Sequence, residues 1–259
     1  MISGSFYSEI RKNENNPIFI NINSKTIKKN GVYNFKIFQL RKIFETLLKH
    51  NIKNIIFLGK ISRPNLSEFK NDGEIEKYLP ILIESFKKGD GRILLTVIKI
   101  FRENGFNVLS PKKIGDKFFL KNNNLCNNYK GTDELDIKKS IKILNDLSKY
   151  DNAQAIVSVK GHVIAIEAAE GTDELLKRSI LIRKNLDNIR TKAGILIKIP
   201  KKKQSMLVDL PVIGPKTINL INKANLNGLA LNSKYTMVYN KLEVLRLVKK
   251  FKLKIYDLS

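Results

Sequence analysis

Segments with the apolar periodicity of a strand alternate along the chain with segments that have the apolar periodicity of a helix. In the first half, PIFINI (17–22) predicts a strand, FKIFQLRKIFETLLKH (35–50) an amphipathic helix and NIIFLG (54–59) a fully buried strand. These three segments predict one βαβ unit. Two apolar helices, near 79–88 and 91–104, and the strand FNVLS (106–110) are predicted after it.

The second half continues the same alternation. It is predicted to open with a helix (134–149), and AIVSV (155–159) and HVIAIEA (162–168) predict a hairpin that turns at Lys160-Gly161. Because strand and helix patterns alternate, we expect an α/β fold with a largely parallel sheet. The remaining predicted elements are a helix from about 172, the strand GILIKI (194–199), a short strand MLV that ends at Asp209, a helix from Pro215, the segments GLALN (228–232), YTMVYN (235–240) and KLKIYDL (252–258), and a helix at 240–251.

A polar segment divides the chain. KNNNLCNNYKGTD (121–133) is rich in Asn and has no apolar period, which is typical of an interdomain linker. We therefore predict an N-terminal domain at 1–125, a linker at 126–133 and a C-terminal domain at 134–259.

The composition indicates a globular protein. A chain of 259 residues with 42% hydrophobic content can supply a core. The most apolar run, Ile93–Ile98, is closed by Lys99 and is far shorter than the ~18 residues of a membrane span. No signal-peptide pattern precedes it, so we expect a cytoplasmic protein. The single Cys126 excludes an internal disulfide.

The formal net charge of +24 raises the question of a nucleic-acid partner. Of the 48 basic residues, 39 are Lys and 9 are Arg, and they are dispersed. A dedicated nucleic-acid binder would show clustered Arg and aromatic stacking positions, and neither is seen. The basic coat fits a solvated surface, or affinity for an anionic lipid surface or a nucleotide, better than specific DNA or RNA recognition.

Ligands of open α/β sheets bind beyond the carboxyl ends of strands, and LGKISRP follows such an end. Gly59 permits close backbone approach, and Lys60 and Arg63 beside Ser62 can neutralise phosphate oxygens. A solvated basic loop would explain the same residues.

A second loop, EAAEGTDELLKR, joins a predicted strand to a predicted helix. Thr172 and Asp173 are suitable for plain helix capping, because acidic and hydroxyl side chains stabilise helix N-termini. Glu167 and Glu170 are harder to explain, since a Glu that points inward is costly unless it is paired or bound to a metal. The pattern does not decide which of the two points inward.

A third loop, VDLPVIG, places Asp209 between two apolar residues and before a proline. A carboxylate in such surroundings usually has a charge partner, a metal ion or a proton to transfer, although a structural turn is the alternative. Lys198 and Lys201–Lys203 lie shortly before it. His50 and His162 have no motif-like partners, so carboxylates, lysines and a hard cation, Mg²⁺ or Mn²⁺, remain as the candidate chemistry.

The five letters GTDEL occur twice, at Gly131–Leu135 and Gly171–Leu175. We interpret the first copy as a helix start, whose Asp133→Ala change should cost at most ~1 kcal/mol and leave activity intact. The second copy follows a buried strand that carries glutamates, and we predict that it belongs to a phosphate and metal site. Asp173→Ala should therefore cost activity.

Several segments together resemble the LpxI-type UDP-2,3-diacylglucosamine diphosphatases of lipid A biosynthesis. The resemblance extends from about residue 50 onward, with KxSRP, KGD, EGTD and VDLPxIG at the expected separations. It is carried by FLGKISRPNL, FKKGDGRILLTVIKIFRENGF, AIVSVKGHVIAIEAAEGTDELLKR, GILIKIPKKKQSMLVDLPVIGPKTI and GLALNSKYTMVYN. The start departs from the family, because only Met1-Ile2 precedes the turn Ser3-Gly4-Ser5, where relatives have a full first strand.

The resemblance implies an N-terminal Rossmann-like domain and a C-terminal α/β domain with the substrate held between them. It implies a cytoplasmic enzyme, peripheral to the inner membrane, that uses Mg²⁺ to hydrolyse a lipid-linked UDP-sugar to UMP and 2,3-diacylglucosamine 1-phosphate. The partners expected are this substrate and an anionic membrane surface, and a homo-oligomer is compatible with the sequence.

The resemblance carries over Asp209, the EGTD residues Glu170–Asp173 and the loop residues Lys60, Ser62, Arg63 and Pro64, and the residue pattern adds the other expected roles. Asp209 and Asp173 are the expected catalytic residues, and Asp209 and Glu167 the expected metal ligands. The expected substrate-binding residues are Gly4, Ser5, Gly59, Lys60, Ser62, Arg63, Lys88, Asp90, Glu170, Gly171, Thr172 and Lys198. The alternatives are a nucleotide-sugar or dinucleotide-binding protein without catalysis, which the intact carboxylates argue against, and a basic nucleic-acid-binding protein.

Overall fold

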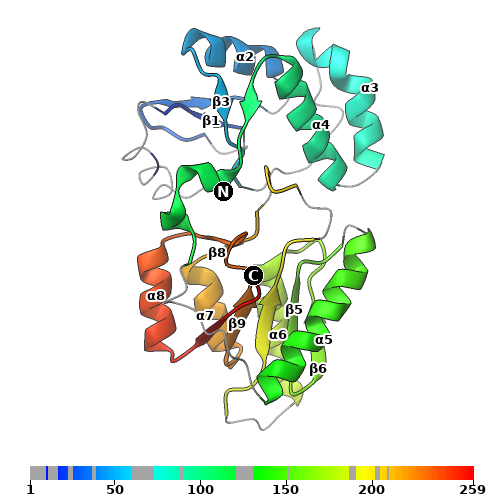
Figure 1. Ribbon diagram of the computed structural model, residues 1–259, viewed down its shortest axis with the longest axis vertical. Helices are drawn as coiled ribbons and strands as arrows, with labels where there is room; N and C mark the ends of the chain where they lie inside the picture. The colour runs from blue at the N-terminus through cyan, green and yellow to red at the C-terminus, as the bar shows by residue number, and fades with distance from the viewer. Residues whose placement is uncertain are drawn as a thin grey trace. The chain divides into compact units, whose positions relative to one another are not determined.

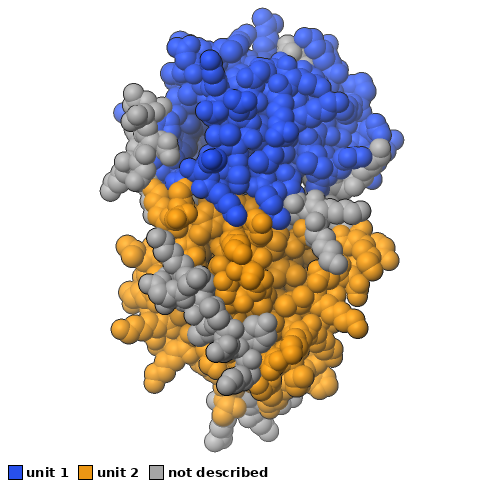
Figure 2. All heavy atoms as spheres, viewed as in Figure 1, with its two compact units in different colours: residues 1–114, 205–209 blue, residues 115–204, 210–259 orange. Residues whose placement is uncertain are grey.

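A computed structural model of the chain divides into two compact units, which Figure 2 shows in different colours. Unit 1 comprises residues 1–114 and 205–209, and unit 2 comprises residues 115–204 and 210–259. The structure describes residues 10, 17–22, 26–36, 39–59, 73–87, 90–120, 131–150, 152–186, 191–201, 205–208 and 210–259.

Unit 1 is a mixture of short parallel strand pairs and longer helices. The strand β1 (Phe19–Asn21) pairs in parallel with β2 (Val32–Asn34), and β3 (Asn54–Ile55) pairs in parallel with β4 (Asn107–Val108). The predicted βαβ unit is therefore wrong in its pairing, because among the described residues β1 and β3 belong to different sheets. The other elements are α2 (Leu40–Lys49), α3 (Gly73–Lys87), α4 (Asp90–Glu103) and the 3-10 helix η2 (Pro111–Ile114).

The core of unit 1 is built from helix faces of regular period. In α2 the buried residues Leu40, Ile43, Phe44 and Leu47 recur at the spacing of one helical face. The Phe44 ring packs edge-on against the ring of Phe101 in α4, with ring centroids 5.2 Å apart. The same periodicity is what made these helices predictable.

The segment 205–208 corrects the predicted strand MLV. Met206 and Leu207 form a turn, and the buried Val208 packs into the core of unit 1. The hydroxyl of Ser110 donates to the Met206 carbonyl at 2.9 Å. This hydrogen bond attaches the turn to the segment after β4. An apolar triplet alone does not distinguish a strand from an anchored turn.

Unit 2 contains a five-stranded sheet in the order β11-β9-β7-β5-β6. Its strands are β5 (Ala155–Val159), β6 (His162–Ile166), β7 (Ile195–Lys198), β9 (Gly228–Leu231) and β11 (Lys254–Asp257). The strands β7, β9 and β11 are mutually parallel, whereas β5 is antiparallel to both β6 and β7. The predicted hairpin is confirmed, with Lys160 and Gly161 at its turn in positive-φ conformations of 50° and 82°.

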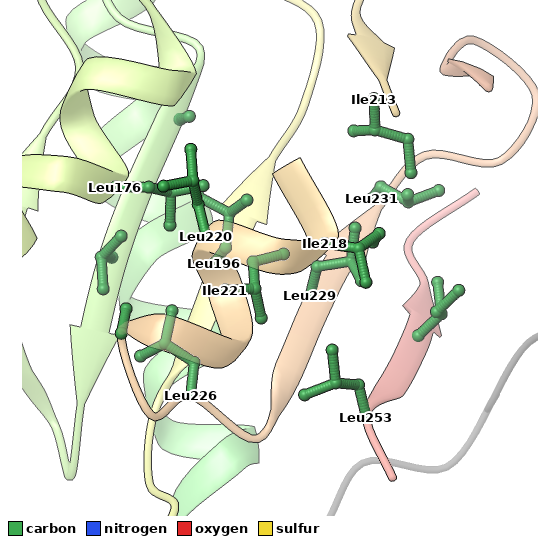
Figure 3. Close-up of a cluster of buried hydrophobic side chains, with 14 of the residues drawn as sticks. Leu176, Leu196, Ile213, Ile218, Leu220, Ile221, Leu226, Leu229, Leu231 and Leu253 are labelled. Atoms are coloured by element: carbon green, nitrogen blue, oxygen red, sulfur yellow. The ribbon is translucent and has the colours of Figure 1, made fainter. Parts of the chain in front are cut away.

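Helices cover both faces of this sheet, as Figure 1 shows for α5 on one side and α7 and α8 on the other. The helix α5 (Thr132–Leu147) packs on the face that carries Ile195 and Ile197. The opposite face, which carries Leu196, is covered by α6 (Thr172–Leu186), α7 (Pro215–Lys223) and α8 (Lys241–Lys250). Figure 3 shows Leu196 and Leu229 of the sheet beside Ile218 and Ile221 of α7. The α/β class expected from the sequence is confirmed.

Smaller elements complete unit 2. A two-stranded parallel pair joins β8 (Val212–Ile213) and β10 (Met237–Val238). Two 3-10 helices, η3 (Asp116–Phe118) and η5 (Ser148–Tyr150), flank the region that includes α5.

The first GTDEL copy is more than a helix start. Asp133 is 2% exposed and accepts hydrogen bonds from Tyr256 Oη at 2.7 Å and Asn227 Nδ2 at 2.8 Å. One turn later the fully buried Asp136 accepts from Ser158 Oγ at 2.7 Å and from the backbone N–H groups of the hairpin turn. The predicted helix start is confirmed, because α5 begins at Thr132, but these carboxylates also fasten α5 to β5, to β11 and to the residue before β9.

Candidate active site

The carboxyl ends of four strands of unit 2 meet at one edge of the sheet. Since β5 is antiparallel to both β6 and β7, the strands β6, β7, β9 and β11 all run in the same direction. The segments that follow them therefore leave the sheet at the same edge. This is where open α/β sheets bind ligands.

Two charged residues flank a small one at this edge. Ala155 pairs with Lys198 on one side, and its carbonyl accepts from the Glu167 N–H at 2.9 Å on the other. Lys198 shares the face of Leu196, two residues before it, which is the face that α6 covers. The methyl side chain of Ala155 leaves space for the longer side chains of Glu167 and Lys198 above it.

Glu167, Thr172 and Lys198 are connected by hydrogen bonds. Lys198 Nζ donates to Thr172 Oγ1 at 2.5 Å, and Thr172 Oγ1 donates to Glu167 Oε1 at 3.0 Å. Glu167 is 5% exposed and Lys198 is 4% exposed. The structure therefore identifies Glu167, of the two glutamates in the loop, as the buried one.

The second oxygen of Glu167 has an unusual position. Glu167 Oε2 is buried and has no hydrogen-bond partner among the residues that the structure describes. An unpaired buried carboxylate oxygen is costly, so a ligand contact would compensate for it. Gly171, with a φ of 85°, is close by, and a Cβ added there would lie 3.9 Å from Glu167 Oε1.

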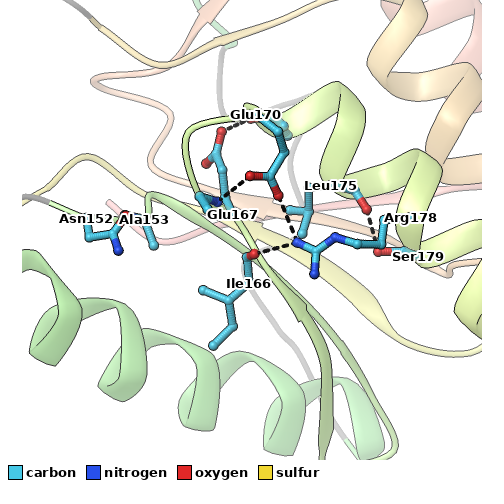
Figure 4. A network of polar contacts seen from close by, with 10 residues as sticks. Asn152, Ala153, Ile166, Glu167, Glu170, Leu175, Arg178 and Ser179 are labelled. Atoms are coloured by element: carbon cyan, nitrogen blue, oxygen red, sulfur yellow. Dashed lines mark hydrogen bonds and ion pairs between the residues drawn. The ribbon is translucent and has the colours of Figure 1, made fainter.

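Glu170 holds the loop itself. Its carboxylate accepts from the Ala168 N–H at 3.1 Å and from Arg178 Nη2 at 2.8 Å, and Arg178 Nη2 also donates to the Ile166 carbonyl (Figure 4). Its own backbone N–H and the donors Arg178 and Ala168 outweigh burial and hold the pKa of Glu170 below its usual value. Both oxygens are thus engaged within the loop and α6.

Asp173 joins α6 to α7. Its Oδ2 lies 2.8 Å from Lys216 Nζ, and its Oδ1 accepts from Thr217 Oγ1 at 3.4 Å. The hydrogen bond and charge of Asp173 raise the pKa of Lys216 above its ordinary value. With 35% of its side chain exposed, Asp173 remains accessible to a ligand.

The structure brings together only some of the residues predicted for the site. Glu167, Gly171, Thr172 and Lys198 form one group at the sheet edge, with Glu170 and Asp173 on the same loop and helix start. In unit 1, Gly59 follows β3 with a φ of 87°, and Asp90 is the first residue of α4. The predicted residues that lie outside the described residues are Gly4, Ser5, Lys60, Ser62, Arg63, Lys88 and Asp209.

Sequence reasoning missed the partners that hold these side chains. Arg178 lies seven residues after Gly171, two helical turns on, so its position on α6 could have indicated contact with the loop. Lys216 and Thr217 follow Pro215 at the start of α7, and their contact with Asp173 depends on how α6 and α7 pack. No local pattern would have revealed that contact.

Within the described residues, no group of three or more His, Cys, Asp or Glu side chains is arranged to hold a metal ion. Likewise, no helix in that part of the chain has the length and apolar character to cross a membrane.

The fold and the site define a two-unit α/β protein with a buried carboxylate and lysine at the sheet edge of its second unit. Residues 2–118 match the model of the LpxI N-terminal domain, and residues 123–256 match that of the LpxI C-terminal domain. The chain is 32% identical over 190 residues to the UDP-2,3-diacylglucosamine pyrophosphatase LpxI of Caulobacter vibrioides, across 73% of this chain and 68% of that protein. The chain belongs to the LpxI family, which confirms the resemblance seen in its motifs.

Proposed function

We propose that this protein hydrolyses the pyrophosphate bond of UDP-2,3-diacylglucosamine, giving UMP and 2,3-diacylglucosamine 1-phosphate in lipid A biosynthesis. Membership of the LpxI family supports the reaction class. The observation that carries the proposal is the hydrogen-bonded group of Glu167, Thr172 and Lys198 at the carboxyl edge of the sheet, in which Glu167 and Lys198 are buried. Buried ionisable groups at such an edge are more typical of a functional site than of a core.

The chemistry of a diphosphate ester explains the proposed roles. Its negative charge must be neutralised and a water molecule held in line with the bond that breaks. We assign the positioning of that water to Asp209, with Asp173 assisting. The substrate would be held by Gly4, Ser5, Gly59, Lys60, Ser62, Arg63, Lys88, Asp90, Glu170, Gly171, Thr172 and Lys198.

A divalent cation, Mg²⁺ or alternatively Mn²⁺, belongs to the proposal. Mg²⁺ keeps several waters and is usually held by one or two carboxylates together with substrate phosphates. The buried Glu167 Oε2, which has no partner among the described residues, fits that pattern, and Asp209 is proposed as the second ligand. When bound, the ion would neutralise charge on the phosphate oxygens.

The setting of the reaction is also proposed. We infer a Rossmann-like N-terminal domain over 1–125, a linker at 126–133 and a catalytic domain over 134–259. We infer a cytoplasmic enzyme on the anionic inner-membrane surface, where the formal charge of +24 would favour binding.

The test is direct. The purified chain is incubated with UDP-2,3-diacylglucosamine, and UMP is followed with Mg²⁺, with Mn²⁺ and with EDTA. UMP should form only with a divalent ion. If no UMP formed under any metal condition, the proposed enzymatic activity would be refuted. Salt-sensitive oligonucleotide binding in place of UMP release would favour a nucleic-acid-binding protein instead.

One variant and its control test the role assigned to Asp209. Asp209→Ala should keep the fold and substrate binding but lower turnover by about 10²-fold or more. Asp146→Ala is the control, because Asp146 is an exposed residue near the end of α5, where its Oδ1 lies 3.1 Å from Lys149 Nζ. Near-normal turnover of Asp209→Ala would refute the role given to Asp209.

A further inference from the structure

Three polar side chains at the sheet edge, of which Glu167 and Lys198 are buried, form a chain of hydrogen bonds with a fixed direction of donation. The Lys198 ammonium is a donor only, so at 2.5 Å it must donate to Thr172 Oγ1. A hydroxyl has a single proton, which Thr172 then directs to Glu167 Oε1 at 3.0 Å. Lys198 thus makes Thr172 a donor toward the carboxylate.

This arrangement leaves one oxygen of the carboxylate for another contact. Glu167 Oε1 is engaged by Thr172, and Glu167 is held at its backbone by the Ala155 carbonyl. The side chain is therefore fixed at both ends, with Oε2 buried and unpartnered among the described residues. The two oxygens of a carboxylate are chemically equivalent, so it is the position of the Thr172 hydroxyl that engages Oε1 and leaves Oε2 without a partner among the described residues.

We propose that Thr172 is a positioning residue, which orients Glu167 so that Oε2 binds a divalent cation. The inference rests on the proposed function, because the cation is part of that reaction. Lys198 acts through Thr172, since its ammonium fixes the direction of the hydroxyl.

Removing the hydroxyl has two physical consequences. Glu167 Oε1 loses its donor, and the carboxylate is free to rotate. Lys198, which lies across Ala155 from Glu167, then competes with the cation for the carboxylate. Both effects weaken cation binding without any change in the ligand residue itself.

The experiment measures Mn²⁺ binding to the full chain by electron paramagnetic resonance, without substrate. Thr172→Val should raise the Mn²⁺ dissociation constant about 10- to 100-fold, the usual effect of losing a hydrogen bond to a metal ligand. Thr172→Ser, which keeps the hydroxyl, should restore most of the affinity. Thr132→Val is the matched control, because Thr132 is the exposed Thr of the first GTDEL copy, and it should bind Mn²⁺ as the unmodified chain does.

The outcomes separate this inference from the proposed function. Mn²⁺ binding by Thr172→Val equal to that of the unmodified chain overturns the positioning role, and so does a failure of the unmodified chain to bind Mn²⁺. Weaker binding by Thr172→Val with no UMP from the unmodified chain refutes the reaction but supports the role. Thr172→Ala repeats the measurement if Thr172→Val does not fold, as judged by circular dichroism.

Discussion

The phenol of Tyr256 donates a hydrogen bond of 2.7 Å to Asp133 Oδ2, which fastens the last strand of the sheet to the first turn of α5. Asn227 binds the other oxygen of the carboxylate at 2.8 Å, and Lys254 Nζ lies 3.7 Å from Oδ2. Because Asp133 is 2% exposed and Tyr256 is also 2% exposed, water cannot replace these contacts if one partner is removed.

Asp133→Ala should therefore lower the free energy of unfolding by about 2 to 3 kcal/mol, as expected for buried hydrogen bonds to a charged group. Urea unfolding at pH 7 measures the change. Tyr256→Phe should cost about 1 kcal/mol, and the double variant should cost less than the sum because the two groups are in contact. A cost below ~1 kcal/mol for Asp133→Ala would restore the interpretation as simple capping.

Local patterns predicted most of unit 2 because its elements have regular periods and clear ends. The strand β5 was predicted with the observed bounds, and α7 begins at Pro215 as expected. Two segments of unit 1 were not predicted, because their structure depends on distant packing. Val208 joins the core of unit 1 from a turn, and β2 is a three-residue strand with no apolar period of its own.

The site was predictable only in part for the same reason. A Glu after an apolar strand indicated an inward carboxylate, and Glu167 is indeed buried. That Thr172 and Lys198 bind each other, at a separation of 26 residues, follows from the pairing of β7 with β5 and not from any motif. The different surroundings of Asp133 and Asp173 likewise come from the fold, because their flanking letters are identical.

Asp173→Ala should lower turnover by about 10- to 100-fold if Asp173 assists the reaction. Its ion pair with Lys216, at 2.8 Å, offers a way to separate that role from structural support. Lys216→Met removes the same pair but keeps the carboxylate. UMP release should therefore fall much less in Lys216→Met than in Asp173→Ala.

Two results would contradict this distinction. Equal losses of turnover from Lys216→Met and Asp173→Ala would make the pair a structural clasp between α6 and α7. Equal losses from Asp173→Ala and Asp133→Ala, measured per folded molecule, would remove the difference between the two GTDEL copies.

Glu170 should make part of the stability depend on pH. Its pKa is held below the ordinary value of 4.5 in the folded chain, so the ionised form is favoured by folding. This contribution is fully present above pH ~4.5 and is lost as the pH falls through the lower folded pKa. The stability difference between the unmodified chain and Glu170→Gln should therefore shrink as the pH falls from 7 to 3 in urea unfolding.

The donors of Glu170 provide the control for that experiment. Arg178 Nη2 binds Glu170 Oε1 at 2.8 Å, so in an Arg178→Met background Glu170→Gln should have a smaller effect at pH 7. A difference that is constant over the whole pH range would show that the Glu170 carboxylate does not contribute through its charge.

Gly228 lies where an added side chain would meet the backbone of the neighbouring strand. A Cβ added at Gly228 would lie 1.9 Å from the Lys254 carbonyl oxygen, in the first paired position of β9 and β11. Backbone cannot move aside as a side chain can, so Gly228→Ala should force the strands apart and cost about 1 to 3 kcal/mol in urea unfolding. Gly214→Ala is the matched comparison, because its Cβ would meet the Tyr239 side chain at 3.1 Å, and it should cost less. If the two variants were equally stable, β9 and β11 would not be paired as closely as the structure describes.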